Sequence, residues 1–384
     1  YHTRNNMNFE FSKAEEMIQK IVREFAEKEV KPLAEEIDRE GCYPFETFDK
    51  MVKMGLTGIG VPTEYGGSGG DDITKVIAVS EIARKCGATA AILSIHAVFV
   101  QAILQFGTEE QKQKYLPLVT SGGKKTAFAL TEPDAGSDAA AVKTTAVVDG
   151  EDYVINGTKC FITGGNLADY VILFASTDLT KGVKGLSAII VPKGTPGFST
   201  GKIENKMGIR ASQTAELIFD NCRVPRSNLV GKEGQGFKIA MIGLDGARIG
   251  IAAQALGLAE GALEESVNYM KERVQFGKPI ASFQGLQWYI SDMATKIECA
   301  KWMIYRAASL KIAGKPFTKE AAMAKLNAAE TASFVTNKAL QIHGGYGYMK
   351  DYPLERMLRD AKITEIYEGT SEIHKVVISR AVLG

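Results

Sequence analysis

The sequence reads Arg359-Asp360-Ala361-Lys362-Ile363-Thr364-Glu365-Ile366-Tyr367-Glu368-Gly369-Thr370-Ser371-Glu372-Ile373 toward its end. Here one carboxylate, Glu368, lies between a bulky aromatic, Tyr367, and a glycine, Gly369. We predict a helix from Ser371 to Arg380. A carboxylate with such neighbours can sit in an apolar pocket, which would raise its pKa into the range useful for proton abstraction. Taken alone, the stretch is more typical of a solvated loop glutamate, so its weight depends on the rest of the chain.

Size and composition limit the class of protein. The 384 residues are enough for two or three domains with a sizeable core. The formal net charge of +1 favours neither nucleic acid nor an anionic membrane as a partner. The five cysteines are scattered without Cys-x-x-Cys spacing, and the four histidines show no ligand spacing. This pattern predicts a reducing compartment, with neither a disulfide framework nor a metal site.

The uncharged stretch from Ala88 to Phe106 is almost long enough to cross a membrane. Polar residues such as Ser94 and His96 interrupt it, so we predict a buried core helix and no membrane insertion. We expect the natural start at Met7, residues 1–6 being an extension, and we expect no secretory signal. The predicted location is the cytoplasm, and a mature mitochondrial matrix protein is the alternative.

The hydrophobic pattern divides the chain into three regions. The first shows apolar residues at helical spacing and begins with a capping box at Ser12 and Glu15. The second alternates as short strands do. The third is helical again, with a break at residues 314–316 and a helix end at His343, and long helices with short breaks predict a bundle. The predicted domains are residues 7–125 (helical), 126–234 (β) and 235–384 (helical bundle).

Two turn signals organise the middle region. Asp149-Gly150 separates two strand-like runs, and Asn156-Gly157 follows before Cys160-Phe161-Ile162. Further short strands are predicted at residues 171–174, 186–191 and 217–219. Closely spaced hairpins of this kind predict a compact antiparallel barrel or sandwich.

Two polar segments of the middle region can bind a planar ligand. Residues 128–138 end a predicted strand in a turn whose N–H groups and hydroxyls can bind an anion or the polar edge of a ring. Residues 159–165 supply Phe161, which can lie against a planar cofactor, and Thr163, which can bond its edge. Taken singly, each segment is more typical of a capped turn or of a core aromatic that leads into a turn.

Two segments of the third region can hold an extended cofactor. Residues 273–279 lie between two helices, where Arg273 can neutralise a pyrophosphate and Phe276 can cover an aromatic base. A helix C-cap with a basic residue explains this segment equally well. Residues 341–347 form a glycine-rich helix exit that can admit a dinucleotide close to the backbone. The exit is not Gly-x-Gly-x-x-Gly after a strand, which excludes a Rossmann site, and His343 alone is more typical of a structural role.

The tract from Leu244 to Arg248 is expected to open a long helix. Arg248 can contact Glu368 or line a substrate channel. A buried pair of Asp245 with Arg248 that fixes neighbouring helices is at least as good an interpretation, because buried arginines are usually paired.

Together these motifs resemble the acyl-CoA dehydrogenase family, most closely its short-chain, butyryl-CoA type. The resemblance runs from about Met7 to the last residue. It implies a fold that is mainly α with a central β domain, namely an α-helical N-terminal domain, a β-barrel middle domain and a C-terminal four-helix bundle. The motifs are Leu-Thr-Glu-Pro-x-Ala-Gly-Ser-Asp from Leu130, Phe-Ile-Thr from Phe161, Arg-x-Gln-Phe-Gly-Lys-Pro from Arg273, Gln-Ile-x-Gly-Gly-Tyr-Gly from Gln341 and Ile-Tyr-Glu-Gly-Thr from Ile366.

The resemblance implies FAD as the cofactor and gives each motif a role, with Glu368 as the catalytic base. The residues that would meet the flavin are Phe128, Ala129, Leu130, Thr131, Ser137, Phe161, Ile162 and Thr163. Those that would hold the ADP portion, across a subunit interface, are Arg273, Phe276, Gln284, Gln341, Ile342, His343, Gly344 and Gly345. Those that would contact FAD near the catalytic loop are Thr370, Ser371 and Glu372. Those that would contact the acyl-CoA are Ser137, Asp245, Gly246, Ala247, Arg248, Tyr367 and Gly369.

The implied reaction is α,β-dehydrogenation of an acyl-CoA to a trans-2-enoyl-CoA. Glu368 would remove the α-proton while hydride leaves the β-carbon for the flavin, and an electron-transferring flavoprotein would take the electrons. The family usually forms a homotetramer. Two alternatives stay open. One is an enoyl-CoA reductase that runs the reverse reaction in an electron-bifurcating complex. The other is a catalytically silent flavin-binding scaffold, against which the intact Glu368 argues.

Two positions depart from the family pattern: Phe161 stands where relatives often carry tryptophan, and Glu372 where some carry glutamine. These changes put the flavin stacking and one FAD contact in doubt, but not the class. We expect a short acyl chain, with the uncharged tract Ala88 to Phe106 forming part of its pocket and Ile92, Leu93 and Ile95 as its floor. In the alternative, the small residues Ala88, Ala90 and Ala91 leave a deeper cavity. Because each methylene contributes only about 0.8 kcal/mol, such a floor must also discriminate by exclusion.

Overall fold

A computed structural model describes residues 10–384, so the expected start at Met7 and the extension before it lie outside the described residues. The first helix begins as predicted. The Ser12 N–H donates to Glu15 Oε2 at 2.6 Å, and the Glu15 N–H donates to Ser12 Oγ at 3.3 Å. The helices of this region are α1 (Lys13–Phe25), α2 (Ala34–Glu40), α3 (Phe45–Lys53), α4 (Asp72–Ala83), α5 (Gly87–Phe106) and α6 (Glu109–Thr120).

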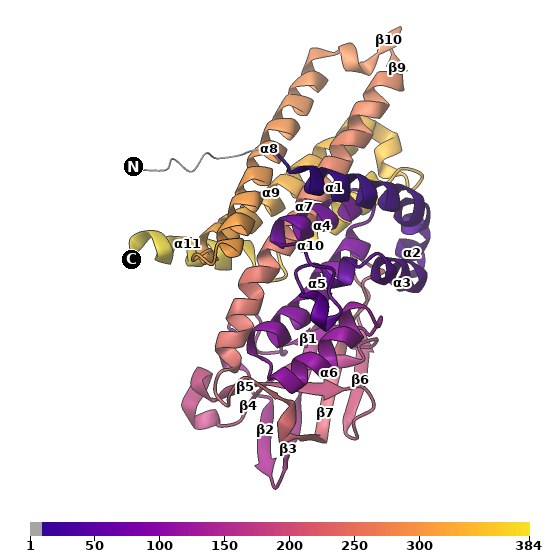
Figure 1. The fold of residues 1–384 in the computed structure, drawn as a ribbon. Helices are drawn as coiled ribbons and strands as arrows, with labels where there is room; N and C mark the ends of the chain where they lie inside the picture. Colours follow the sequence, from indigo (N-terminus) through magenta and orange to yellow (C-terminus); the bar gives the residue numbers. More distant parts are fainter. Residues whose placement is uncertain (1–9) are drawn as a thin grey trace.

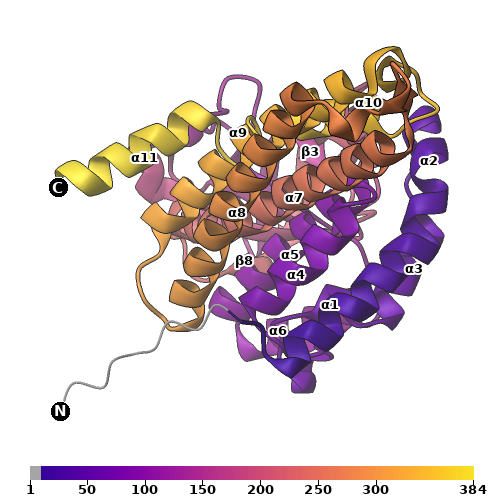
Figure 2. The same ribbon diagram turned by 90° about the horizontal axis from the view of Figure 1, so that it is seen from above.

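The uncharged helix α5 lies in the interior, as predicted, with the other helices and the sheet around it (Figures 1 and 2). By length and composition alone, α5 and the later helix α7 (Gly236–Glu272) could each cross a membrane. However, 83% of the apolar window of α5 and 67% of that of α7 are buried inside the molecule. Burial against other elements gives both helices the apolar surroundings that their side chains require.

The middle region forms a mixed sheet rather than the predicted antiparallel one. Its strand order is β6-β7-β3-β2-β4-β5-β8, and β1 pairs with β4. Most pairs are antiparallel, but β1 and β2 both run parallel to β4. The hairpin pattern could not show this, because parallel pairs join strands that are not neighbours in sequence. The strands are β1 (Thr126–Ala129), β2 (Thr145–Asp149), β3 (Asp152–Thr163), β4 (Tyr170–Ser176), β5 (Leu186–Pro192), β6 (Phe198–Ile203), β7 (Thr214–Pro225) and β8 (Leu229–Val230).

One of the two predicted turns is wrong. Asp149 and Asp152 pair across a tight connection between β2 and β3, as expected. Asn156-Gly157, in contrast, lies inside the single long strand β3, at a shift in its register against β7. Gly157 takes φ +149°, and a Cβ there would lie 2.4 Å from Thr144 Oγ1. This glycine therefore serves a bulge and a close contact between strands instead of a hairpin.

The last region contains the bundle. The long helices α7, α8 (Gln284–Ile312) and α9 (Thr318–His343) pack on one another, and α4 and α5 pack on α7. A small hairpin of β9 (Val274–Gln275) and β10 (Lys278–Pro279) joins α7 to α8 at the end of the molecule far from the sheet (Figure 1). Two further helices, α10 (Leu354–Ile363) and α11 (Ser371–Leu383), pack on α9, and α11 continues outward beyond the bundle (Figure 2).

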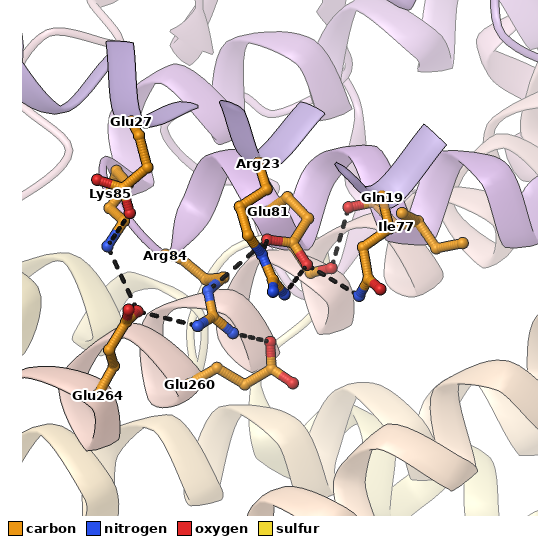
Figure 3. Close-up of polar contacts among 10 residues, drawn as sticks. Gln19, Arg23, Glu27, Ile77, Glu81, Arg84, Lys85, Glu260 and Glu264 are labelled. Carbon is orange, nitrogen blue, oxygen red and sulfur yellow. Dashed lines mark hydrogen bonds and ion pairs between the residues drawn. The ribbon is translucent and has the colours of Figure 1, made fainter. Parts of the chain in front are cut away.

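A partly buried cluster of charged side chains joins the N-terminal helices to the bundle (Figure 3). Arg23 of α1 donates two hydrogen bonds to Glu81 of α4, at 2.9 and 2.7 Å. The next turn of α4 carries Arg84, which binds Glu260 at 3.0 Å and Glu264 at 2.9 Å, both on α7. Glu81 is only 1% exposed, so this pairing is what makes its burial tolerable.

A second cluster joins all three regions immediately before the Glu368 turn. Arg359 of α10 donates to Asp38 of α2 at 2.6 Å and to the Met207 carbonyl, between β6 and β7, at 3.0 Å. The neighbouring Asp360 accepts a hydrogen bond from the Ile209 N–H at 2.5 Å. Burial raises the pKa of Asp360 to about 6. The helix that leads into the turn is thus held by contacts from the two preceding regions.

Candidate active site

The turn between α10 and α11 presents Glu368. Thr370 caps α11 by accepting a hydrogen bond from the Ile373 N–H at 3.3 Å. Just before it, Glu368 and Gly369 have φ values of +53° and +100°. Such a conformation costs free energy for a residue with a side chain and is found where the surroundings enforce it, often at functional sites. At Gly369 a Cβ would lie 3.0 Å from His374 Cε1, which leaves little space for any other residue.

The surroundings of Glu368 disfavour its charge. The residue is half-buried, but its Oε2 atom has no contact with solvent and no hydrogen-bond partner within residues 10–384. Burial raises the pKa of Glu368 from its ordinary value of 4.5 to about 7, although the charges of Lys325 and Arg248 act in the opposite direction. The raised pKa predicted from the neighbouring residues is therefore confirmed, and it suits a group that accepts a proton near neutral pH.

The backbone of the same turn leaves a donor free. The Glu368 N–H donates no hydrogen bond to any other described residue. A donor held by the turn that also holds the carboxylate can stabilise negative charge on a neighbouring oxygen, because it needs no reorganisation. The turn therefore offers a base and a hydrogen-bond donor close together.

The structure adds Lys325 of α9, which was not predicted from the sequence. Its side chain has no exposed surface, and its Nζ donates to the Gly369 carbonyl at 2.6 Å. Burial lowers the pKa of Lys325 to about 7, against the opposite influence of Glu368. The sequence did contain a sign that Lys325 is buried. It lies on the same helical face as Ala321 and Ala328, and a stripe of alanines along one face is typical of a buried face.

Tyr367 is held in place through its hydroxyl group. The hydroxyl donates a short hydrogen bond to Gln254 Oε1, and Gln254 Nε2 donates to the Gly87 carbonyl at 3.0 Å. Gln254 is fully buried and was not predicted from the sequence. Since the hydroxyl of Tyr367 is already bonded, its ring is the part left to contact a ligand.

Asp245 and Arg248 form an ion pair, which was one of the two interpretations of this tract in the sequence. Arg248 Nη1 donates to Asp245 Oδ1 at 2.5 Å, and Asp245 Oδ2 accepts from Thr318 Oγ1 at 2.6 Å. Arg248 nevertheless acts on the charge of Glu368, and its Nε has no partner among the described residues. The prediction that this tract opens a helix is wrong, because α7 begins earlier, at Gly236.

A cavity of about 320 Å³ lies beside this stretch of α7. Gly243, Gly246 and Gly250 line it on one helical face, and a Cβ on any of them would meet the nearest atom at 3.4–3.5 Å. Glycine inside a helix costs about 1 kcal/mol relative to alanine, so three of them on one face indicate a space that is kept open. The residues that line the cavity from α5 are Ser94, Ala97, Val98, Gln101 and Gln105.

The predicted floor residues Ile92, Leu93 and Ile95 do not line this cavity. All three are buried, with exposures of 7%, 3% and 6%. They lie on other faces of α5, because a helix turns its faces by about 100° per residue. Ile92 and Ile95 line the small cavity beside Thr163, and Leu93 packs in the core. The uncharged helix borders a cavity, and its part in an acyl pocket stays a prediction. Which face of the helix meets the cavity could not be read from an apolar stretch without polar markers.

The segments predicted to meet the flavin begin in β1 and at the end of β3. Phe128 is in β1, where its ring lies 4.7 Å from that of Phe174, and an added Cβ on Gly243 would reach it at 3.8 Å. This places β1 next to the cavity wall. Phe161 is 64% exposed with φ +56°, and Thr163 ends β3 beside a small cavity of about 20 Å³. Ala129, Leu130 and Ile162 are buried between these positions, and Thr131 and Ser137 are more accessible.

A buried ion pair, also not predicted from the sequence, supports these segments. Lys159 is fully buried and donates to Glu132 Oε1 at 2.8 Å and to the Leu130 carbonyl at 2.9 Å. Glu132 also accepts from the N–H groups of Lys143 and Thr144, at 2.7 and 3.0 Å. Burial lowers the pKa of Lys159 to about 8. The pair thus connects residues 128–138 with residues 159–165, the two segments predicted to meet the flavin.

The segments predicted to hold the ADP portion meet around an open hollow of about 650 Å³ at the β9–β10 end of the bundle. Arg273 ends α7 there and lies over the ring of Tyr346 at 5.3 Å. Phe276 projects from the hairpin with 92% of its surface exposed. Ile342, His343, Gly344 and Gly345 line the opposite side. Gln284 and Gln341 are exposed beside the hollow but do not line it.

The glycines give an independent test of whether these segments fit a bound group. Among the described residues, Gly136, Gly285 and Gly345 alone combine an ordinary φ with no atom within 4 Å of an added Cβ. Neither the backbone nor the packing of this chain therefore requires glycine there. All three lie in or beside segments predicted to bind FAD, where a close approach of ligand to backbone would require them.

Near the base, two further residues have buried polar atoms without hydrogen bonds. Ser371 Oγ and both ring nitrogens of His374 are buried without a partner among the described residues. Thr370 is occupied as the cap of α11, and Glu372 is exposed in its first turn. Because buried polar atoms are normally hydrogen-bonded, this cluster is consistent with a polar ligand at the start of α11.

Three domains of one family match the chain in order. The N-terminal domain of acyl-CoA dehydrogenases matches residues 12–123, the middle domain residues 127–222 and the C-terminal domain residues 234–383. The family resemblance seen in the sequence is therefore confirmed, and so is the predicted fold class.

Individual relatives match over almost their whole length. An acryloyl-CoA reductase (NADH) of Anaerotignum propionicum is 66% identical over 98% of this chain and 96% of its own. A short-chain specific acyl-CoA dehydrogenase of Clostridium acetobutylicum is 56% identical over 97% of this chain and 99% of its own. A chain from a structure of the electron transferring flavoprotein of Acidaminococcus fermentans, solved to study flavin-based electron bifurcation, is 52% identical with a TM-score of 0.97, covering 98% and 100% of the two chains. On this evidence the chain belongs to the acyl-CoA dehydrogenase family.

Proposed function

We propose that this protein is an FAD-dependent enzyme that removes hydrogen from the α- and β-carbons of a short acyl-CoA and forms a trans-2-enoyl-CoA. The observation that carries the proposal is the Glu368 carboxylate, whose Oε2 is buried without a partner and whose pKa is raised to about 7 by burial. An acyl thioester is only weakly acidic at its α-carbon, so the reaction needs a base of this kind, aligned and shielded from water.

In the proposed mechanism Glu368 accepts the α-proton. The free N–H of the same residue donates to the thioester carbonyl oxygen, where negative charge develops as the proton leaves. Bound FAD would supply the acceptor for the hydride that leaves the β-carbon. The ring of Tyr367, fixed through Gln254, shields the carboxylate from water.

The FAD site we propose combines the two groups of segments. Phe128 to Thr131, Ser137 and Phe161 to Thr163 would hold the flavin, with the Glu132–Lys159 pair behind them. Thr370, Ser371 and Glu372 would contact FAD beside the base. Arg273, Phe276, Gln284 and residues 341–345 would hold the ADP portion. The exposed Phe276 and the openness of this hollow favour a site that a second subunit completes, as in the homotetramer typical of this family.

The acyl-CoA would occupy the cavity between α5 and α7, in contact with Ser137, Asp245 to Arg248, Tyr367 and Gly369. We expect a short acyl chain, in line with the short-chain relative of Clostridium acetobutylicum. The expected result is a kcat/KM that is highest for butyryl-CoA and falls for longer chains, measured with an artificial electron acceptor. A steady rise from butyryl- to dodecanoyl-CoA would refute the short-chain assignment and leave the dehydrogenase assignment intact.

The reverse reaction is a second candidate with its own support. A relative with 66% identity is an acryloyl-CoA reductase (NADH), and a chain with a TM-score of 0.97 comes from a study of electron bifurcation. The same base and donor serve both directions. Reduction of an enoyl-CoA by NADH in the presence of an electron-transferring flavoprotein would favour the reductase, whereas reduction of that flavoprotein by butyryl-CoA would favour the dehydrogenase. The cytoplasm is the location we propose in either case.

The decisive test is Glu368→Gln. The variant should bind FAD and assemble as the wild type does, but its turnover should fall by roughly two to four orders of magnitude, because a general base contributes about that much. Bleaching of the flavin absorbance by butyryl-CoA measures the chemical step directly. A rate within a few-fold of wild type would contradict the assignment of the base. A wild-type protein that holds FAD but never bleaches with any acyl-CoA would instead indicate a flavin-binding scaffold.

A further inference from the structure

Lys325 is a buried cation without a matching anion. It has no exposed surface, and none of the carboxylates in residues 10–384 lies within ion-pairing distance of its Nζ. Its hydrogen bond goes to a backbone carbonyl, that of Gly369, at 2.6 Å. Burying a lysine without an ion-pair partner lowers the stability of the fold, so such a residue usually has a functional role. Its position next to the strained Glu368 turn indicates what that role is.

The geometry of the turn gives Lys325 its first task. With φ +53° at Glu368 and +100° at Gly369, the chain reverses before α11 starts, so the Gly369 carbonyl is outside the hydrogen bonding of either helix. Without a donor, a buried carbonyl of this kind would be costly. The ammonium group of Lys325 supplies the donor and connects the turn to the rigid helix α9.

The second role of Lys325 is electrostatic and concerns the charge of Glu368. Lys325 from α9 and Arg248 from α7 act on the carboxylate, and the carboxylate acts on the adjacent Tyr367. His374 from α11 lies against Gly369. Burial keeps Tyr367 uncharged and lowers the pKa of His374 to about 3, so neither carries charge at neutral pH. Arg248 is neutralised in part by Asp245 at 2.5 Å.

Two other carboxylates act on Lys325 itself. Glu365 and Glu372 favour its charged form, together with Glu368, against the effect of burial. Glu365 is engaged by Lys362 at 2.6 Å and by the Ser333 hydroxyl, and Glu372 is exposed at the start of α11. Lys325 is therefore the cation without a partner of its own that acts on Glu368.

We propose that Lys325 is a positioning residue for Glu368: it holds the turn through the Gly369 carbonyl, and in its protonated form it favours the ionised Glu368 carboxylate, which removes the α-proton. This inference rests on the proposed function. It assigns to α9 a part of the base's chemistry that the sequence motif around Glu368 does not contain.

The test uses the full chain with FAD bound and an acyl-CoA analogue that has sulfur in place of the β-carbon, 3-thiabutyryl-CoA. This compound can lose its α-proton but has no β-hydride to transfer, and a long-wavelength band of the bound flavin reports the proton loss. In Lys325→Met the pH midpoint of this band should rise by at least about one unit relative to wild type, because a nearby positive charge has been removed. In Lys325→Arg, which keeps the charge, the midpoint should stay close to wild type.

Kinetics provide a second reading. For Lys325→Met, kcat/KM with butyryl-CoA should fall at least about tenfold at pH 6.5 and recover toward wild type at pH 9, where Glu368 is ionised without help. A residue that only supports the fold would lower activity equally at both pH values. Lys338→Met, on the same helix with its Nζ over the ring of Tyr289, serves as the matched control and should titrate as the wild type does.

The outcomes separate this inference from the proposed function. If Glu368→Gln fails to deprotonate the analogue while Lys325→Met titrates as the wild type does, Lys325 has no such role and the base assignment stands. If Glu368→Gln still deprotonates the analogue, the proposed function itself is wrong. Should Lys325→Met fail to fold, Lys325→Gln retains a donor for the Gly369 carbonyl without charge. It must then show the same rise in midpoint, and an unchanged midpoint would overturn the proposal.

Discussion

At the scale of single residues, the site depends on a carboxylate placed where its charge is unfavourable. Glu368 takes a left-handed backbone conformation and buries Oε2 without a partner. Each feature costs stability, and each is of use to a base, since the strain aims the side chain and the burial raises its basicity. The same cost gives two measurable consequences.

The first consequence is the pH dependence of activity. Because the base must be ionised and its pKa in the free protein is about 7, kcat/KM should rise with pH through about 7 and level off above it. For a carboxylate with an ordinary pKa, the profile would instead be flat from pH 5.5 upward. A series of kcat/KM measurements from pH 5.5 to 9 with butyryl-CoA distinguishes the two.

The second consequence is a trade of stability for activity. The folded protein holds a proton on Glu368 between pH 4.5 and about 7, where the unfolded chain has lost it. The contribution of this group to stability therefore falls as pH rises through that window, and the penalty is complete above it. Glu368→Gln should unfold at a higher temperature than the wild type at pH 8, and the gain should disappear near pH 4.5. Equal unfolding temperatures at pH 8 would contradict a buried, uncompensated carboxylate.

At the scale of elements, the β9–β10 hairpin projects from the molecule, and contacts within the chain do not explain its exposed position. Phe276 is 92% exposed at its tip and meets the ring of Phe283 edge-on at 5.9 Å, and the Arg273 guanidinium at its base lies over the ring of Tyr346. A two-stranded hairpin of this size is not stable by itself. Its exposed position is explained if bound FAD and a neighbouring subunit cover the hairpin.

Arg273→Ala tests that role. Losing one charge-assisted contact to a pyrophosphate should cost about 1.5–3 kcal/mol of FAD binding, and the oligomer should loosen with it. Flavin content after dialysis and sedimentation velocity measure the two effects. Lys278→Ala, on the same hairpin over the ring of Phe283, is the control and should retain FAD. If the flavin content and the sedimentation profile of Arg273→Ala both match the wild type, the hairpin is not the ADP site.

At the scale of the whole molecule, two charged clusters join regions that the chain pattern separates. The cluster in Figure 3 links α1 and α4 to α7, and the Arg359 cluster links α2 and the sheet to α10. Gly208 shows how closely these regions approach, because a Cβ there would lie 2.4 Å from the backbone of Arg359. Movement of one region against another would therefore move the helix that carries the Glu368 turn.

Arg359→Met should accordingly weaken the whole assembly. It removes hydrogen bonds to Asp38, Glu355 and the Met207 carbonyl, and the partially buried position should make the loss about 1.5–3 kcal/mol. A lower unfolding temperature and faster cleavage by a protease report it. Arg39→Met is the matched control, since the Arg39 side chain pairs with exposed glutamates next to it on α2, and its loss should leave the unfolding temperature close to that of the wild type. Equal effects of the two changes would show that the cluster does not join the regions.

Much of this protein follows from local sequence. The capping box at Ser12, the break at residues 314–316 and the end of α9 at His343 depend on neighbours within a few residues, which is why their prediction succeeds. The raised pKa of Glu368 was one of two interpretations of the stretch around Tyr367 and Gly369, and the other motifs favoured it over a solvated loop glutamate. The ordered motifs carried the family assignment for the same reason, since each is a short, contiguous segment.

Tertiary structure alone decided the remainder. The parallel pairing of β1 with β4, the face of α5 that meets the cavity, and the bulge at Asn156-Gly157 all depend on strands or helices distant in sequence. The partners of the site, Lys325 and Gln254, are separated from the Glu368 turn by 44 and 113 residues in their contacts. The residues next to them in sequence do not show which groups they contact. The role of a buried polar side chain depends on the hydrogen-bond partner that folding places beside it.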